Sequence, residues 1–312
     1  MTNLLGEHDL VWLDGGLATE LQRAGLPVRA PWWTTWALNA EPRRKILRSI
    51  HESYILAGAQ VITANTFRCN LRALSSLGLD KAGLSWMVQA AIGIAVAVRD
   101  ANGGRLEVQV AGSMAPIADC YRPSLVPPDD ELRTEHGWLA TELIRSGADF
   151  VLIETMNSER EARIALEQVH LAGGRAWVSF VCTQHGRLLS GESLASAAKA
   201  VEQDGAEAVL VNCATMDATE SALRVFREVC SIPFGAYPSI EERRGIPEGE
   251  HVDRYVPPSV GPDVFADRLG DWLQEFPVAI LGGCCGTSPG HLAAARRRSM
   301  MESSGEIDRQ SA

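Results

Sequence analysis

The chain has 312 residues and a formal net charge of −10 at pH 7, with 46% hydrophobic and 22% charged residues. This acidic balance, without a basic stripe, argues against nucleic acid as a partner. We expect no membrane segment, because no transmembrane run is visible. The N-terminus has neither a basic nor an apolar leader segment, so we expect no signal peptide and a cytoplasmic location. The seven cysteines have no framework spacing and are interpreted as thiols, some of them ligands.

Short apolar segments recur along the chain and alternate with helical patterns. Nearly continuous apolar runs are typical of parallel strands buried on both faces. The predicted strands cover residues 10–14, 60–65, 107–111, 149–154, 176–180, 208–212, 233–237 and 278–281. The helical spacing of apolar residues predicts helices over 42–56, 80–100, 131–146, 158–171, 193–202 and 218–229.

Eight strand–helix units predict an α/β fold, a single (β/α)8 TIM barrel over residues 1–300. A doubly wound sheet is the rival architecture. Residues 301–312 are polar and predicted to form a frayed tail. Three long connections, 29–40, 116–130 and 240–260, would cover the mouth of a barrel, where long loops are usually functional. The alternative is that they are variable surface insertions.

The segment 282–286, Gly-Gly-Cys-Cys-Gly, follows the last predicted strand and precedes a helix start. The glycines allow a tight turn that presents Cys284 and Cys285 together. Cys213 follows another strand, so a barrel would bring three thiolates to one end. Three soft sulfur ligands and an open fourth position are typical of catalytic zinc. For Cys213 alone, a buried small hydrophobe is the commoner role. The other four cysteines are interpreted as structural or incidental.

Polar residues end several predicted strands, and active-site groups of a barrel come from these positions. Glu154 ends a strongly apolar strand, where an unpaired carboxylate is costly. A cationic ligand group or an internal Arg is therefore expected beside it. Asp14-Gly15-Gly16 is either a simple turn or a site where glycine amides approach a carboxylate while Asp14 binds an ammonium group. The predicted substrate-binding residues are Asp14, Gly15, Gly16, Asn65, Thr66, Glu154 and Ser179.

Five motifs in this order resemble the homocysteine S-methyltransferase family, and they span most of the chain. They are 14–21 (DGGLATEL), 63–67 (TANTF), 153–156 (IETM), 211–213 (VNC) and 282–287 (GGCCGT). The combined Asn-Cys and Gly-Gly-Cys-Cys-Gly signal is specific, whereas Asp-Gly-Gly alone would be weak.

The resemblance implies a (β/α)8 barrel with Zn²⁺ on Cys213, Cys284 and Cys285 and the homocysteine sulfur as fourth ligand. It implies that Asp14 and Glu154 recognise the amino group of homocysteine. Zinc deprotonates the substrate thiol, which is a poor nucleophile at neutral pH. No catalytic residue beyond this thiolate is then required, because the leaving group departs neutral.

The methyl donor is not specified by these motifs. We predict a small onium donor of the S-methylmethionine or S-adenosylmethionine type, with a separate methyl-corrinoid protein as the alternative. The acceptor is homocysteine or a related thiol or selenol. Trp32, Trp33 and Trp36 either form an aromatic face for the cation or pack their loop onto the barrel.

Two other classes of function are rivals of the methyltransferase. An aldolase or decarboxylase barrel needs a Schiff-base lysine at a strand end, and Lys45, Lys81 and Lys199 all lie elsewhere. The alternative of a non-catalytic zinc-binding, thiol-binding or redox-sensing protein stays open. Metal analysis would help to distinguish it from the methyltransferase. The sequence makes no prediction of oligomeric state.

Overall fold

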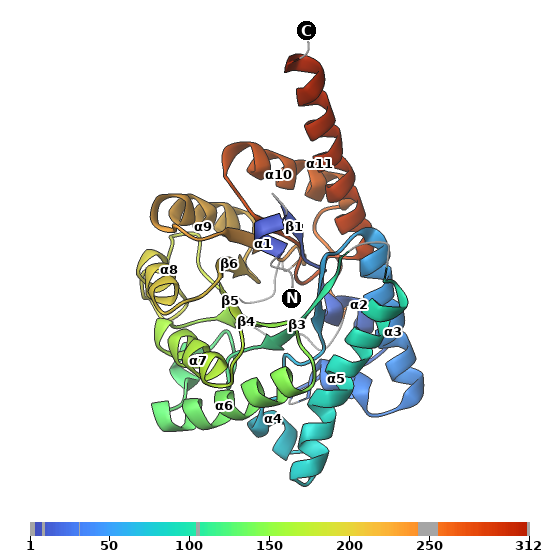
Figure 1. The fold of residues 1–312 in the computed structure, drawn as a ribbon, viewed down its shortest axis with the longest axis vertical. Coiled ribbons are helices and arrows are strands. Elements are labelled where there is room, and N and C mark those ends of the chain that lie inside the picture. Colours follow the sequence, from blue (N-terminus) through green and yellow to red (C-terminus); the bar gives the residue numbers. More distant parts are fainter. Residues whose placement is uncertain (1–3, 8–9, 31, 104–106, 243–254, 311–312) are drawn as a thin grey trace.

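The structure is a computed structural model that describes residues 4–7, 10–30, 32–103, 107–242 and 255–310 (Figure 1). Its centre is one eight-stranded parallel sheet. The strands are β1 (Val11–Trp12), β2 (Val61–Ala64), β3 (Gln109–Met114), β4 (Phe150–Met156), β5 (Ala176–Phe180), β6 (Ala208–Asn212), β7 (Phe234–Tyr237) and β8 (Ile280–Leu281).

The strands pair in sequence order from β2 to β8, and β8 pairs with β1. An isolated parallel bridge between Leu13 and Val61 joins β1 to β2 and completes the ring. This order confirms the predicted (β/α)8 barrel. It excludes the doubly wound sheet, in which the strand order reverses along an open sheet.

The six predicted helices are confirmed, with ends shifted by at most a few residues. They are α3 (Glu41–Ala57), α5 (Lys81–Ala101), α6 (Asp129–Arg145), α7 (Glu159–Leu171), α8 (Leu194–Gln203) and α9 (Met216–Val229). The structure adds elements that the sequence analysis did not delimit. These are α1 (Leu4–Glu7), α2 (Leu17–Arg23), α4 (Leu71–Ser75), α10 (Pro262–Glu275), α11 (Pro289–Gln310) and the 3-10 turns η1 (Thr34–Leu38) and η2 (Pro123–Leu125).

Helix α5 is long and apolar enough to cross a membrane by length and composition. In the structure it contacts α3, α6 and the strands β2 and β3. One face, from Leu84 to Val98, is buried against these elements. Its apolar character is therefore explained by its place in the barrel wall.

Helix α11 continues to Gln310 and projects beyond the barrel in Figure 1. A frayed tail was predicted for residues 301–312, but most of this segment is helical in the structure. Residues 311–312 lie outside the described residues. Of the three long connections, 29–40 contains η1 and 116–130 contains η2. Residues 243–254 of the third lie outside the described residues.

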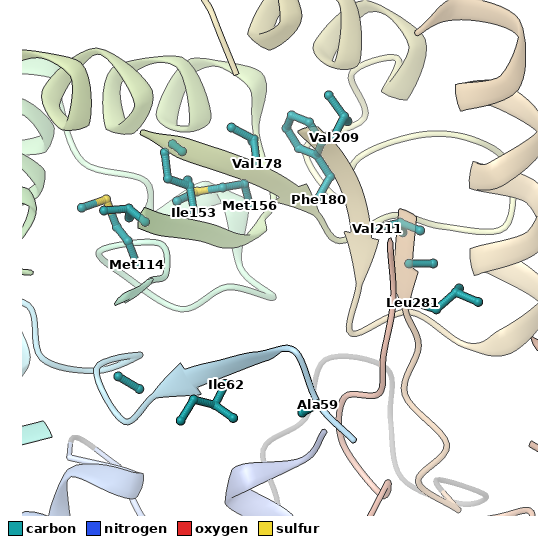
Figure 2. Close-up of a cluster of buried hydrophobic side chains, with 14 of the residues drawn as sticks. Ala59, Ile62, Met114, Ile153, Met156, Val178, Phe180, Val209, Val211 and Leu281 are labelled. Carbon is teal, nitrogen blue, oxygen red and sulfur yellow. The ribbon is translucent and has the colours of Figure 1, made fainter. Parts of the chain in front are cut away.

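Side chains alternate along each strand between the barrel interior and the surrounding helices. In β4, Phe150 and Leu152 belong to the interior cluster, so the next inward position is Glu154. The outward side chains form a separate, larger cluster under the helices, part of which is shown in Figure 2. Near the ends of β2, β3, β5, β6 and β7, the same alternation turns inward the side chains of Thr63, Ser113, Ser179, Asn212 and Tyr237. Inside the barrel, the side chains near the carboxyl ends of the strands are therefore polar, whereas those deeper in the interior are apolar.

Candidate functional site

Three cysteines converge at the carboxyl end of the barrel, as predicted. Cys213 follows β6, and Cys284 and Cys285 follow β8. The sulfur atoms of Cys213 and Cys284 lie 2.8 Å apart, those of Cys284 and Cys285 lie 3.9 Å apart, and all three lie within 4.8 Å of one another. Two sulfurs bound tetrahedrally to one zinc ion at about 2.3 Å would lie roughly 3.8 Å apart. Among the described residues this is the only such cluster of three or more metal-type ligands.

The backbone holds the paired cysteines from two sides. The Cys284 amide donates to the Pro238 carbonyl at 2.9 Å, beyond β7, and the Gly283 amide donates to the Asp14 carbonyl at 3.0 Å, beyond β1. Close approach requires glycine in the β1 turn, since a Cβ on Gly16 would lie 2.7 Å from the Cys284 carbonyl oxygen. The corner is therefore fixed by both neighbouring strands.

Cys213 has a backbone φ of 52°, in the left-handed region that non-glycine residues rarely adopt. The preceding residue, Asn212, explains how this conformation is held. Its side chain accepts hydrogen bonds from the Thr155 amide (2.9 Å) and the Ser179 hydroxyl (2.7 Å), and it donates to the Thr155 hydroxyl (2.8 Å). Asn212 therefore ties together the ends of β4, β5 and β6.

Replacing Asn212 by alanine is expected to lower the free energy of unfolding by about 2–4 kcal/mol, because it leaves buried donors on Thr155 and Ser179 unpaired. Urea denaturation of the metal-free protein measures this loss. The matched control is Asn102→Ala, at the half-buried C-cap of α5, where the side chain makes one hydrogen bond, to the Val98 carbonyl, and the loss should stay below about 1 kcal/mol. Equal effects of the two substitutions would contradict the role of Asn212.

A cavity of about 100 Å³ adjoins the three sulfurs, and two buried acids line it. Asp14 accepts hydrogen bonds from the Thr63 amide (2.8 Å) and hydroxyl (2.9 Å). Glu154 accepts from the Ser113 hydroxyl and, at 3.3 Å, from the Tyr237 hydroxyl. No Lys or Arg is among the described residues that line the cavity. The expected cation beside Glu154 is therefore not an internal arginine of this wall.

Burial raises the pKa of both acids to about 7, from 3.8 for Asp14 and 4.5 for Glu154. The hydrogen bonds from Thr63 to Asp14, and from Ser113 and Tyr237 to Glu154, oppose this rise, and the charge of Glu154 adds to it at Asp14. A ligand with an ammonium group would relieve the cost of two buried negative charges. The cavity is thus suited to a cationic end of a small molecule.

The other predicted substrate residues fall into two groups. Gly15, Gly16 and Asn65 line the cavity. Asn65 donates to the Thr34 carbonyl at 2.9 Å, whereas its buried side-chain oxygen has no hydrogen-bond partner among the described residues and is available to a ligand. Thr66 and Ser179 do not line the cavity. The Thr66 hydroxyl donates to the Ser113 carbonyl at 2.8 Å, and that of Ser179 donates to Asn212, so both link neighbouring strands at this end of the barrel.

The three tryptophans of the connection 29–40 are also divided. Trp33 lines the cavity, where its ring stacks on Phe67 at 5.8 Å between centroids. Trp32 and Trp36 contact each other edge to face at 4.7 Å and line a separate hollow with Trp86. Only Trp33 is therefore placed where it can contact a ligand near the sulfurs.

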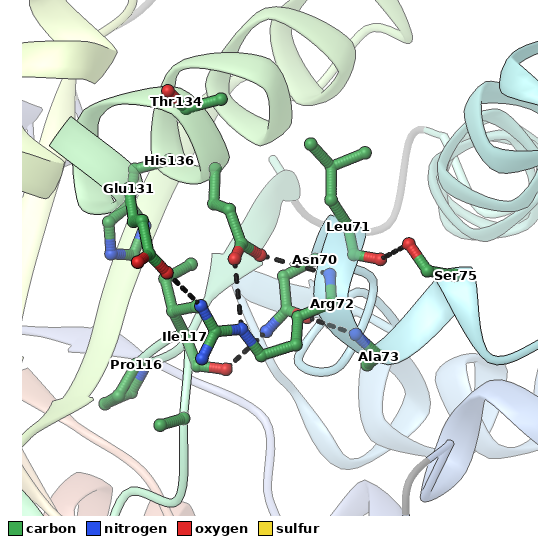
Figure 3. Close-up of polar contacts among 12 residues, drawn as sticks. Asn70, Leu71, Arg72, Ala73, Ser75, Pro116, Ile117, Glu131, Thr134 and His136 are labelled. Atoms are coloured by element: carbon green, nitrogen blue, oxygen red, sulfur yellow. Dashed lines mark hydrogen bonds and ion pairs between the residues drawn. The ribbon is translucent and has the colours of Figure 1, made fainter. Parts of the chain in front are cut away.

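The connection 116–130 forms a further wall of the cavity through Cys120 and Tyr121. Side chains from neighbouring loops hold its backbone. Arg68 donates to the Ala118 carbonyl at 2.6 Å, and Asn157 donates to the Cys120 carbonyl at 3.0 Å. Figure 3 shows a neighbouring part of this arrangement, in which Asn70 donates to the Ile117 carbonyl.

Sequence reasoning assigned no role to several residues that contact the acids or line the cavity. Thr63 and Tyr237 occupy inward positions near strand ends, so the alternation along β2 and β7 could have identified them. Cys120 was predicted to be structural or incidental, and no role was predicted for Tyr121, because no periodic signal places a loop residue. All seven cysteines are free thiols, as predicted. Lysines 45, 81 and 199 lie on helices, which removes the basis for a Schiff-base enzyme.

Known proteins resemble this chain over most of its length. Residues 11–299 match the model of the family described as homocysteine S-methyltransferase. The homocysteine S-methyltransferase of Escherichia coli is 28% identical over 312 residues, covering 95% of this chain and 97% of that protein. The methionine synthase of Mycobacterium tuberculosis is 30% identical over 291 residues, which cover 89% of this chain but only 24% of the synthase.

The fold is shared with a solved structure. The metallated form of the homocysteine methyltransferase MmuM from Escherichia coli superposes with a TM-score of 0.79 at 24% identity, covering 95% of this chain and 98% of that one. At this identity the match concerns the fold. It agrees with the closed barrel described above.

Proposed function

Because the chain belongs to the homocysteine S-methyltransferase family, we propose that it transfers a methyl group from a small onium donor to the thiol of homocysteine, giving methionine. The observation that carries this proposal is the shared cavity, in which three thiols face two buried acids. The thiols suit a metal that activates sulfur, and the acids suit the ammonium group of an amino acid. A redox sensor would have no use for the two acids.

We propose zinc as the metal, held by Cys213, Cys284 and Cys285. The fit rests on the donor set, because three sulfur ligands favour zinc over harder cations. Contact with Cys284 and partial burial raise the pKa of the Cys213 thiol well above its usual value, and contact with Cys213 does the same for Cys285. A bound cation would compensate the charge of the thiolates. The metallated form of MmuM supports a metal in this fold.

The chain's own residues bind and orient the acceptor. Asp14 and Glu154 would accept hydrogen bonds from its ammonium group, and the free side-chain oxygen of Asn65 could contribute a third. Gly15 and Gly16 permit close approach of its carboxylate to the β1 turn. These contacts fix the amino-acid end of the acceptor and aim its sulfur at the cysteines.

Bound zinc would supply the thiolate at neutral pH by lowering the pKa of the substrate thiol. The sulfur then attacks the methyl carbon of the donor. The new C–S bond forms as the bond from carbon to the onium centre breaks, and that electron pair stays on the leaving group. With a sulfonium donor, a neutral thioether departs, so no general acid is required.

A panel of donors tests the proposal. We expect zinc-loaded protein to form methionine from homocysteine and S-methylmethionine or S-adenosylmethionine, measured by chromatography of the products. Betaine is included as an ammonium donor. The similarity to a quarter-length segment of methionine synthase favours a methyl-corrinoid protein as the alternative donor. Absence of turnover with all three onium compounds would redirect the assignment to that donor.

A further inference from the structure

Strand β4 is irregular at its carboxyl end, near the three cysteines. Its pairing with β5 shifts register between Ile153 and Met156. Both of these side chains belong to the outer cluster, so Glu154 and Thr155 together fill an interval in which regular alternation has one residue. Thr155 has a φ of 58°, a rare conformation for a β-branched residue. The bulge therefore adds one side chain, that of Thr155, beside Glu154 at this end of the barrel.

The side chain of Thr155 reaches the cysteine that follows β6. Its hydroxyl donates a hydrogen bond to the Cys213 sulfur over 3.9 Å. Sulfur is a larger acceptor than oxygen, so its hydrogen bonds are longer. Thr155 and Cys213 are also two of the three non-glycine residues with positive φ in the described part of the chain. Both conformations cost free energy, and strain of this kind is typical of functional sites.

The side-chain amide of Asn212 determines the direction of this hydrogen bond. The Thr155 backbone amide can only donate, so the side-chain oxygen of Asn212 must face it, at 2.9 Å. The Ser179 hydroxyl donates to the same oxygen at 2.7 Å. The Asn212 side-chain nitrogen then donates to the Thr155 hydroxyl at 2.8 Å, which leaves the proton of that hydroxyl for the Cys213 sulfur. The hydrogen bonds therefore run in one direction, from Ser179 through Asn212 and Thr155 to the sulfur.

This chain of hydrogen bonds is withdrawn from solvent. Thr155, Asn212 and Ser179 are all fully buried, so water does not compete for their polar atoms. A hydroxyl that donates to an anionic sulfur makes a charge-assisted hydrogen bond, which is shorter and stronger than one to a neutral thiol. The Thr155 hydroxyl therefore interacts more favourably with Cys213 as a metal ligand than with Cys213 as a free thiol.

We propose that Thr155 is a positioning residue of the metal site, whose hydroxyl orients the Cys213 sulfur and strengthens metal binding. The inference rests on the zinc ligands given under the proposed function, and it adds the hydrogen bonds that support one of them. It also gives Ser179 a role other than substrate binding, because its hydroxyl begins the chain of hydrogen bonds. Loss of an outer partner of a metal ligand typically costs about 10–100-fold in metal affinity or activity.

The test compares threonine variants. Thr155→Val removes the hydroxyl and keeps the β-branched shape, whereas Thr155→Ser keeps the hydroxyl. Thr155→Gly also lacks the hydroxyl but adopts a positive φ without strain, so it serves if the valine variant does not fold. The matched control is Thr66→Val, which removes an equally buried hydroxyl that donates to the Ser113 carbonyl.

Two measurements report on the metal site itself, independently of methyl transfer. Competition with a chelator gives the Kd for Zn²⁺. Absorption of the Co²⁺-substituted protein gives the sulfur-to-cobalt charge-transfer band, which responds to hydrogen bonding at the sulfur. Urea denaturation of the metal-free variants shows how much stability each has lost.

We expect Thr155→Val to raise the Kd for Zn²⁺ roughly tenfold or more and to shift the charge-transfer band, because the thiolate loses a hydrogen bond. Thr155→Ser should recover both properties. Thr66→Val should leave both unchanged, although it also loses a buried hydrogen bond. Equal zinc affinity and equal spectra in the two valine variants would overturn the role of Thr155, as would a loss that Thr155→Ser does not recover.

Failure of the proposed function gives different results. A wild-type protein that binds neither Zn²⁺ nor Co²⁺ would refute the zinc assignment and this inference with it. A wild-type protein that binds zinc but forms no methionine would refute methyl transfer to homocysteine alone. In that case the difference between Thr155→Val and Thr155→Ser would still support the role of the hydroxyl.

Discussion

Cys285→Ser is expected to remove zinc from the protein and to lower methyl transfer by more than about a hundredfold. A serine hydroxyl is a harder donor that stays protonated at neutral pH, so the site would lose one of three sulfur ligands. Loss of an outer partner of a metal ligand alone costs about 10–100-fold in metal affinity or activity, so loss of a ligand itself should exceed this. Metal analysis of purified protein, with about one zinc expected per wild-type chain, is the direct measurement.

The matched control is Cys230→Ser, at the end of α9 and outside the cluster. This variant should keep both zinc and activity. Cys213→Ser should behave like Cys285→Ser, because its sulfur belongs to the same cluster. Wild-type protein that is pure and zinc-free at neutral pH without added chelator would refute the zinc assignment.

Glu154→Gln is expected to raise the KM for homocysteine about a hundredfold while leaving the zinc content unchanged. The substitution keeps the shape of the side chain but removes a buried charge that would pair with the substrate ammonium group. Glu142→Gln is the control, since Glu142 is equally buried but lies on α6, away from the cavity. An unchanged KM in Glu154→Gln would refute the amino-group role.

Because the pKa values of Asp14 and Glu154 are raised, the KM for homocysteine is also expected to depend on pH. Only ionised carboxylates attract the ammonium group, so the KM for homocysteine should fall as the pH rises through about 7. In Glu154→Gln this dependence should weaken and reflect Asp14 alone. Initial rates between pH 6 and pH 8 test both statements.

The free energy of unfolding of the substrate-free protein should fall as the pH rises, whereas binding of homocysteine should improve. An acid whose folded-state pKa lies above its unfolded value favours the folded state most at low pH, and that contribution is lost as the pH rises to the folded pKa. For Glu154 this window runs from about 4.5 to about 7. Thermal unfolding of the metal-free protein should therefore show a smaller loss over this window in Glu154→Gln than in the wild type.

The barrel was predictable because its strands are apolar runs bounded by glycine-closed helices. The convergence of the three cysteines was predictable because a parallel barrel brings all strand ends to one face, so Cys213 and Cys284 could meet despite their separation in sequence. Helices α2 and α10 were not predicted, since each begins directly after a glycine-rich or proline-rich turn that reads as loop.

The finer arrangement depended on register and on backbone conformations that sequence does not reveal. Thr66 and Ser179 sit at strand ends like Asn65, yet they bond to neighbouring strands instead of facing the cavity. Among the tryptophans, Trp33 has a positive backbone φ of 46°, and this accompanies its separation from Trp32 and Trp36. Such a conformation is rare for a tryptophan and carries no local signal.

The pairing of β1 with β8 has a consequence for how the enzyme is made. Each of these strands has only two residues, and the turns that follow them carry Asp14 and the paired cysteines. Contacts between the two ends of a chain are the most non-local that a fold contains, and folds rich in non-local contacts fold slowly. A ribosome-bound chain that has not yet released β8 can pair β2 through β7, but it lacks two of the three sulfurs and the partner of its first strand. Barrel closure and completion of the three-sulfur cluster therefore depend on the same pair of strands.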